Sequence, residues 1–240
     1  MLMGLVLAVV LLFPHQEATA GQPTVDLGSA GSFAILARTA ITSTGVTTIE
    51  GNVGVSPAGD ITGIEPGMVS GNIHKNDPIA TQAAADLNTA IIDAAARTGA
   101  TLHDGELGGD ILPPGLYKSS PGLAFSITAK DLTLDAEGNP NAVWIFQMTE
   151  TLILGSGVKV ILINGAQARN IFWQVGSSAT LGEACVLKGN ILASTAITMN
   201  GGARLDGRAL AHTAAVTLIA NTITKKGLYS DQPWRILLMD

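Results

Sequence analysis

The sequence predicts an all-β solenoid, a parallel β-helix, with one long α-helix packed alongside. Similar segments return after 18 residues, as in Ile191-Leu192-Ala193 and Ala209-Leu210-Ala211. Short β-branched runs also alternate with glycine- and proline-rich turns from residue 105 to residue 224. Repeats of this kind stack, because each one buries its apolar face only against its neighbours. A β-sandwich is the competing fold, but hairpin turns such as Asn-Gly between alternating strands are sparse.

The first 20 residues are predicted to be a secretory signal peptide. Leu2 to Phe13 is apolar apart from Gly4, and Ala18-Thr19-Ala20 has the pattern of a cleavage site. The apolar run is shorter than the roughly 20 residues that a membrane-spanning helix needs. We therefore expect a secreted mature chain, residues 21–240, that forms a single domain.

Residues 24–74 are expected to be rich in β-structure. Phe33 to Thr44 is apolar and β-branched, and Gly51-Asn52-Val53 is followed 20 residues later by the similar Gly71-Asn72-Ile73. Residues 56–70 lie between them and contain three glycines and two prolines. That composition predicts a loop or a cap.

A change of period predicts the α-helix over about residues 78–98. Asp77 is a suitable N-cap, Pro78 suits the first helical position, and Gly99 is a suitable stop. The apolar stripe consists mostly of small residues, so we expect the helix to pack closely along a sheet. Its members are Ala80, Ala83, Ala84, Leu87, Ile91, Ala94 and Ala95.

The composition excludes several classes of partner. Charged residues make up 13% of the chain and the formal net charge is −6. Nucleic acids and anionic membranes require a basic face, so neither is expected as a partner. Cys185 is the single cysteine and has apolar neighbours, which predicts a buried free thiol and no disulfide.

One short pattern recurs along the predicted coils: an apolar residue, a threonine and a second apolar residue. Because alternate residues of a strand point to opposite faces, an apolar pair in the core places the threonine toward solvent. The preceding outward positions carry the small residues Ser178, Ala196 and Ala215. The pattern occurs at Leu132-Thr133-Leu134, Ala179-Thr180-Leu181, Ile197-Thr198-Met199 and Val216-Thr217-Leu218.

Such a surface would be a regular lattice of hydroxyl and methyl groups. Adjacent coils lie about 4.8 Å apart and alternate residues of a strand about 6.6 Å apart. β-Branched side chains are stiff at χ1, so the lattice is rigid and suits ordered water as a ligand. Threonine also fills solvent-facing strand positions without any function. Thr195 requires a bulge or corner if it is to face outward together with Thr198.

Several further segments give the chain a family resemblance. The sequence resembles the secreted microbial ice-binding (antifreeze) proteins that are built on an irregular β-helix. The resemblance covers nearly the whole predicted mature chain and is carried by residues 141–147, 163–168, 171–182 and 207–211, with residues 27–37 and 54–57 in the N-terminal half.

The resemblance implies a right-handed β-helix of triangular section, a capping segment, and adsorption of ice to one flat face. Some family members use a Thr-Ala/Gly-x-Thr/Asn motif there, which matches residues 39–42 and 195–198. Both matches lie in a shared Ile-Leu-Ala-x-Thr-Ala-Ile-Thr segment, residues 35–42 and 191–198. This similarity predicts that the N-terminal strand stacks into the same face as the C-terminal coils. Residues 177–180 and the segment from Thr213 to Thr217 depart from the motif, which leaves the area of the binding face open.

Enzymatic activity is not expected. The strand region contains Asp131, Asp135, Glu150, Glu183 and Asp206, but these carboxylates do not recur in register, so we interpret them as turn or solvated groups. The histidines lack metal-ligand spacing, and neither catalytic residues nor a metal or cofactor is predicted. Trp144 and Trp173 lie in apolar runs and are expected in the core. The open alternative is an extracellular polysaccharide-binding or adhesion module, and a polysaccharide lyase is a less favoured alternative.

The sequence thus predicts a secreted, monomeric ice-binding protein whose partner is the ice crystal surface. Residues 227–240 fall outside the repeat and receive no role. Thr198 and Thr217 are the leading candidates for contact with ice. The remaining candidates are Thr180, Thr195, Thr213, Thr39 and Thr42, together with the small residues Ser178, Ala196 and Ala215.

Overall fold

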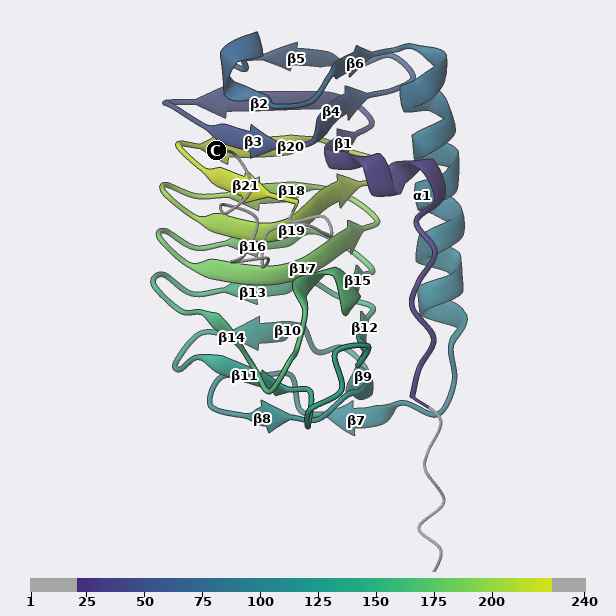
Figure 1. Cartoon of the computed structure of the whole chain (residues 1–240), viewed down its shortest axis with the longest axis vertical. Coiled ribbons are helices and arrows are strands. Elements are labelled where there is room, and N and C mark those ends of the chain that lie inside the picture. Colours follow the sequence, from purple (N-terminus) through teal and green to yellow (C-terminus); the bar gives the residue numbers. More distant parts are fainter. Residues whose placement is uncertain (1–20, 226–240) are drawn as a thin grey trace, which may run out of the picture.

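The computed structural model describes residues 21–225 as a column of stacked coils with one helix along its side (Figure 1). The predicted signal peptide and residues 227–240 lie outside the described residues. Every strand pairing among the described residues is parallel, in three sheets of eleven, seven and three strands. The predicted β-helix is therefore confirmed, and the β-sandwich is excluded.

The eleven-stranded sheet lies under the helix, and we call it the helix-side sheet. Two of its strands branch from the main order: β21 pairs with β19, and β3 pairs with β21. Its main order is β6 (Ile73–Lys75), β4 (Asn52–Val55), β1 (Phe33–Ala37), β19 (Arg204–Ala211), β17 (Val186–Ala193), β15 (Ile171–Val175), β12 (Trp144–Met148), β9 (Gly115–Ser119) and β7 (Thr101–His103), with β21 (Thr222–Thr224) and β3 (Thr48–Glu50) as the branch.

The other two sheets form the remaining sides of the column. The seven-stranded sheet runs β10 (Phe125–Ile127), β13 (Leu152–Leu154), β16 (Ala179–Leu181), β18 (Ile197–Met199), β20 (Val216–Ile219), β2 (Ala40–Thr44) and β5 (Asp60–Thr62). The three-stranded sheet runs β14 (Val160–Ile163), β11 (Leu132–Asp135) and β8 (Ile111–Leu112). Short 3₁₀ turns occur at η1 (Gly28–Ser32), η2 (Pro66–Met68) and η3 (Ala168–Asn170).

The spatial order of the coils differs from their order in the chain. β1 pairs with β19 and β2 pairs with β20, so the N-terminal strands stack on the last C-terminal coil (Figure 1). Ile35 and Ile191 both pair with Ala209, from opposite sides. The similar segments 35–42 and 191–198 therefore flank one intervening coil. This arrangement confirms the predicted stacking of the N-terminal strand into the C-terminal face.

Aromatic side chains stack in register inside the column. Tyr117, Phe146 and Trp173 occupy paired positions on β9, β12 and β15. The rings of Phe146 and Trp173 are 4.1 Å apart at 10°, so they stack nearly parallel. Trp144 and Trp173 are fully buried, which confirms their expected place in the core. Cys185 is fully buried as predicted, and desolvation raises the pKa of its thiol to about 11.

The predicted helix is α1 (Pro78–Ala96). The backbone N–H of Ala80 donates to the Asp77 carboxylate at 2.8 Å, which confirms Asp77 as the N-cap. At the other end the Gln147 side-chain amide donates to the carbonyl oxygens of Ala94 (2.7 Å) and Arg97 (2.9 Å). A side chain of the sheet thus satisfies the last carbonyls, and the helix ends two residues before the predicted 98.

The buried stripe of α1 is narrower than the sequence predicts. Ala90 is buried, whereas Ala84 is half-buried and Ala95 is exposed. The buried positions recur at intervals of three and four residues, with Ala90 and Ile91 adjacent, and the two incorrect positions lie beside that stripe. It packs on outward-facing side chains of the helix-side sheet: Phe33, Leu36, Ile145, Phe172, Leu192 and Leu210.

A pair of glycines turns the two longest strands around a corner of the column. Gly189 on β17 pairs with Gly207 on β19, and their φ angles are +114° and +150°. A Cβ on Gly207 would lie 1.8 Å from the Gly189 carbonyl oxygen. Neither the backbone angle nor the space suits an L side chain.

We therefore expect Gly207→Ala to lower the free energy of unfolding by more than about 2 kcal/mol, through backbone strain and overpacking. Gly201→Ala is the matched control, because a Cβ added at Gly201 would have no neighbouring atom within 4 Å. The control should change stability by less than about 0.5 kcal/mol. Chemical denaturation measures both, and equal effects would contradict the corner's role.

Candidate functional site

Five threonines occupy the same position on five adjacent strands of the seven-stranded sheet. We call them the threonine row. Because neighbouring strands lie about 4.8 Å apart, the row repeats a hydroxyl and a methyl at that interval. The members pair directly in the order Thr180, Thr198, Thr217, Thr42 and Thr62.

The side chains of the row face solvent, while the strand neighbours of Thr180, Thr198 and Thr217 fill the core. Ile197 and Met199, on either side of Thr198, are fully buried. The five threonines are exposed or half-buried, and none makes a side-chain hydrogen bond to another residue within 21–225. Their hydroxyls are therefore available to water, and their β-branching limits rotation at χ1.

A second row of small residues runs beside the threonine row. It consists of the residues two positions earlier on each strand, and we call it the small row. Ala196, Ala215 and Ala40 are half-buried, and Ser178 Oγ accepts a hydrogen bond from the Ala196 N–H at 3.3 Å. Because these side chains are short, the surface next to the threonine row stays low and flat. Ser178, Ala196 and Ala215 thus lie where the sequence placed them.

Thr39, Thr195 and Thr213 lie at the corner between the helix-side sheet and the seven-stranded sheet. Each sits in a bend: between β1 and β2, between β17 and β18, and between β19 and β20. The corner that Thr195 required is therefore present. Thr213 Oγ1 donates to the Ser194 carbonyl at 2.6 Å, so that hydroxyl is engaged within the protein. These three predicted residues border the threonine row rather than belong to it.

Thr133 shares the sequence pattern of the row but lies on another face. On β11 it pairs with Ile111 and Ile161 in the three-stranded sheet. The prediction that groups it with Thr180 is therefore wrong. An apolar–threonine–apolar triplet marks any half-buried strand, and it carries no information about which side of the column that strand occupies.

Thr62 belongs to the row although the sequence pattern does not select it. Residues 60–62 form β5, so the stretch 56–70 is not only a loop or cap. Gly63 follows Thr62, which breaks the apolar–threonine–apolar triplet. The available signal was Ile61-Thr62, which follows Ile41-Thr42 by the 20-residue interval that separates Gly51 from Gly71.

The other two sides of the column differ in chemistry. Helix α1 covers the helix-side sheet, and the third side carries charge. The helix-side sheet continues onto that third side through the residues of β17 and β19 that precede the Gly189–Gly207 corner, and through β21 and β3. There Lys188 Nζ lies 3.1 Å from the Asp206 carboxylate, and Arg204 and Glu50 are exposed on neighbouring strands. Among the described residues, the seven-stranded sheet is thus the side with a broad, flat and mostly uncharged surface.

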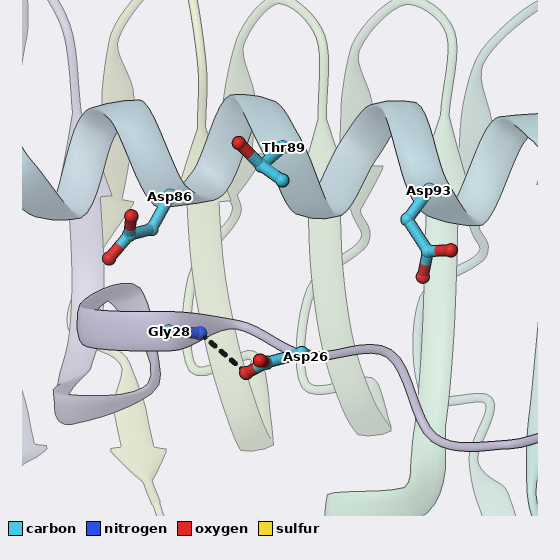
Figure 2. Close-up of a pocket in the computed structure, with 5 residues that line it drawn as sticks. All are labelled: Asp26, Gly28, Asp86, Thr89 and Asp93. Carbon is cyan, nitrogen blue, oxygen red and sulfur yellow. Dashed lines mark hydrogen bonds between the residues drawn. The ribbon is translucent and has the colours of Figure 1, made fainter.

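A pocket of about 250 Å³ lies between the N-terminal segment and α1 (Figure 2). Its carboxylates are engaged by donors of the protein. Asp26 accepts from the Gly28 N–H at 2.9 Å, Asp86 accepts from the Ser29 N–H at 2.8 Å, and Asp93 pairs with Arg97 at 2.7 Å. Of these three contacts, the one between Asp86 and Ser29 joins the N-terminal segment to the helix, and we call it the seam.

Two of the carboxylates in the strand region hold turns. Asp131 accepts from the Lys159 N–H at 2.8 Å, and Asp135 accepts from the Asn164 side chain at 2.8 Å. Each contact joins consecutive coils. Within residues 21–225 no group of three or more histidine, cysteine or acidic side chains is placed to hold a metal ion. In the same part of the chain, no helix is long and apolar enough to cross a bilayer.

Comparison with known proteins identifies the family. The profile of the ice-binding-like family matches residues 35–224. An ice-binding protein of Nostoc sp. is 38% identical over 92% of this chain and 81% of its own length. The chain therefore belongs to the ice-binding-like family.

Solved structures agree with this assignment. The crystal structure of an ice-binding protein from an Antarctic biological consortium has a TM-score of 0.82 and 45% identity, over 86% of this chain and 93% of the other. An ice-binding protein from the Antarctic ascomycete Antarctomyces psychrotrophicus has a TM-score of 0.80 and 40% identity, over 86% of this chain and 100% of the other.

The seam at Asp86 predicts a dependence of stability on pH. Hydrogen bonds from the Ser29 hydroxyl and N–H lower the pKa of the Asp86 carboxyl below its ordinary 3.8. A lowered pKa means that this contribution to stability is present above the unfolded-state value and is lost as the pH falls through the folded-state value.

Asp86→Asn should therefore reduce the loss of unfolding free energy between neutral pH and about pH 3. Denaturant titrations of the native and variant chains across that range measure the difference. Parallel pH profiles for the two proteins would show that the Asp86 contact does not contribute.

Proposed function

We propose that this chain binds ice crystals through its seven-stranded sheet, and that the threonine row and the small row form the contact surface. The observation that carries the proposal is the direct pairing of five threonines on five adjacent parallel strands. Membership of the ice-binding-like family, and relatives that are themselves ice-binding proteins, support it.

The mechanism follows from the rigidity of the surface. Each threonine holds one hydroxyl and one methyl at a fixed point, so water bound along the row takes up a regular spacing set by the strands. Bridging water of this kind binds nearly as well as a direct contact. The ordered layer then joins the ice lattice and fixes the protein to the crystal.

Adsorbed protein restrains further growth of the crystal. Ice can advance only between bound molecules, so its surface curves there, and this curvature lowers the local freezing point. The expected results are thermal hysteresis and inhibition of recrystallisation. Neither effect requires a covalent bond to be made or broken, and the proposal includes no catalytic residue, metal or cofactor.

Within this surface, Thr217 lies in the middle of the row, with Thr198 and Thr42 on either side of it. Thr180 and Thr62 extend it on both sides. Ala196, Ala215 and Ser178 contribute by being small, since a larger side chain there would hold the crystal away. Thr39, Thr195 and Thr213 form the rim at the corner.

We also infer that the protein acts outside the cell as a monomer. The signal-peptide pattern in residues 1–20 supports secretion. A polysaccharide-binding module would be expected to expose aromatic rings for sugars, whereas the two tryptophans within residues 21–225, Trp144 and Trp173, are fully buried. This burial favours ice over a glycan as the ligand.

Thr198→Tyr should abolish most of the thermal hysteresis, because a ring in the middle of the row keeps the flat surface from the crystal. We expect the thermal hysteresis to fall at least roughly ten-fold, which corresponds to a loss of about 1.4 kcal/mol in binding free energy. Nanolitre osmometry measures the loss, and circular dichroism verifies the fold.

Thr133→Tyr is the matched control. It has the same half-buried environment, between two buried apolar strand neighbours, but it lies on the three-stranded sheet. Its activity should equal that of the native protein. If the two folded variants lose activity equally, the seven-stranded sheet is not the site, and if the native protein does not affect ice growth, a glycan ligand becomes the leading hypothesis.

A further inference from the structure

The threonine row stops abruptly at one end. The residue in register with Thr180 on the neighbouring strand β13 is Ile153. On the strand beyond that, β10, the position in register is occupied by Ser126. The Ile153 side chain is 40% exposed, so it faces the same side as the row. Isoleucine has no hydroxyl to bind water, and its side chain extends one carbon further than that of threonine.

The hydroxyl beyond Ile153 is already engaged. Ser126 Oγ donates to the Glu106 carboxylate at 2.8 Å, and Thr128 Oγ1 donates to the same carboxylate at 2.7 Å. Burial raises the pKa of the Glu106 carboxyl, but hydrogen bonds from the Thr128 N–H and hydroxyl, the Ser126 hydroxyl and the Gly108 N–H together lower it below its ordinary value, so the group is a carboxylate at neutral pH. The end of the sheet below Ile153 therefore carries a fixed charge with its own partners.

The small row changes at the same coil. The residue in line with Ser178 is Thr151, whose strand neighbour Leu152 pairs with Ala179. The corner position beside it is the exposed Glu150, whose carbonyl accepts from the Ser177 N–H at 3.2 Å. A charged residue thus replaces a serine at the corner of this coil. Both rows lose their regular character between β16 and β13.

At the opposite end the surface is bounded by an ion pair. Asp60 occupies the small-row position on β5, and its carboxylate lies 2.7 Å from Lys75 Nζ. Both groups are exposed. Charged groups hold water in their own arrangement rather than that of a lattice, so the regular surface ends there too.

We propose that the ice-contact area spans the five coils from Thr180 to Thr62, and that the missing hydroxyl at Ile153 sets its lower limit. The inference rests on the proposed function, since it assigns the boundary of that same surface. It makes Ile153 the position at which the contact surface ends on this side of the sheet. One substitution should therefore enlarge the surface by one coil.

Ile153→Thr supplies the test. Threonine is a good strand residue, and the position is partly exposed, so the fold should persist. The row would then hold six threonines on six adjacent strands. We expect thermal hysteresis at equal concentration to rise roughly two-fold, since a fraction of one net hydrogen bond changes a binding constant by that factor.

Two controls isolate the hydroxyl and the face. Ile153→Val has the shape of threonine without its hydroxyl, and it should leave activity at the native level. Ile161→Thr makes the same change in the same coil at a side chain that is also 40% exposed, but on β14 of the three-stranded sheet. It should likewise leave activity unchanged.

The outcomes separate this inference from the function on which it rests. If the native protein arrests ice growth and folded Ile153→Thr shows no gain, the boundary assignment is wrong and the function stands. An equal gain from Ile153→Val or from Ile161→Thr would also overturn the assignment. If the native protein leaves ice growth unchanged, the proposed function itself fails.

Discussion

Parallel, in-register stacking of short strands is the constraint on which this molecule depends. Each coil hydrogen-bonds to the next, and alternate side chains point into the column or out of it. Any residue type repeated at one position therefore becomes a column. Inside, this produces the stack of Tyr117, Phe146 and Trp173, and outside it produces the threonine row.

The same backbone yields three different surfaces because the outward residues differ from side to side. Leucine and phenylalanine on the helix-side sheet are covered by α1, whose small residues allow a close approach. Lys188 and Asp206 keep the third side hydrated. On the seven-stranded sheet, threonine and alanine leave a surface that is neither covered nor charged. The proposed contact with ice falls on this sheet because one of the other two sides is covered by α1 and the other is charged.

Much of the fold follows from the sequence alone. The 18-residue period predicts the solenoid, Asp77 and Pro78 predict the start of the helix, and the similarity of residues 35–42 to 191–198 predicts the stacking of distant coils. The end of the helix does not follow, because Gln147 from the sheet satisfies the final carbonyls. That contact depends on packing between elements far apart in the chain.

The site is only partly predictable for the same reason. Local alternation places Thr180, Thr198 and Thr217 toward solvent, but it places Thr133 there as well. The side of the column on which a strand lies depends on the corners between strands. Thr62 is hidden by the glycine that follows it, and only its 20-residue distance from Thr42 points to the pairing.

The most direct measurement is adsorption to ice of five single threonine-to-valine variants along the row. An ice-partition assay, with circular dichroism for each variant, gives the fraction of protein held by the crystal. Our account predicts losses that follow the spatial order, largest at Thr217 and its neighbours Thr198 and Thr42, and smaller at Thr180 and Thr62. Losses unrelated to that order, or no loss at any of the five, would contradict the threonine row as the surface that meets ice.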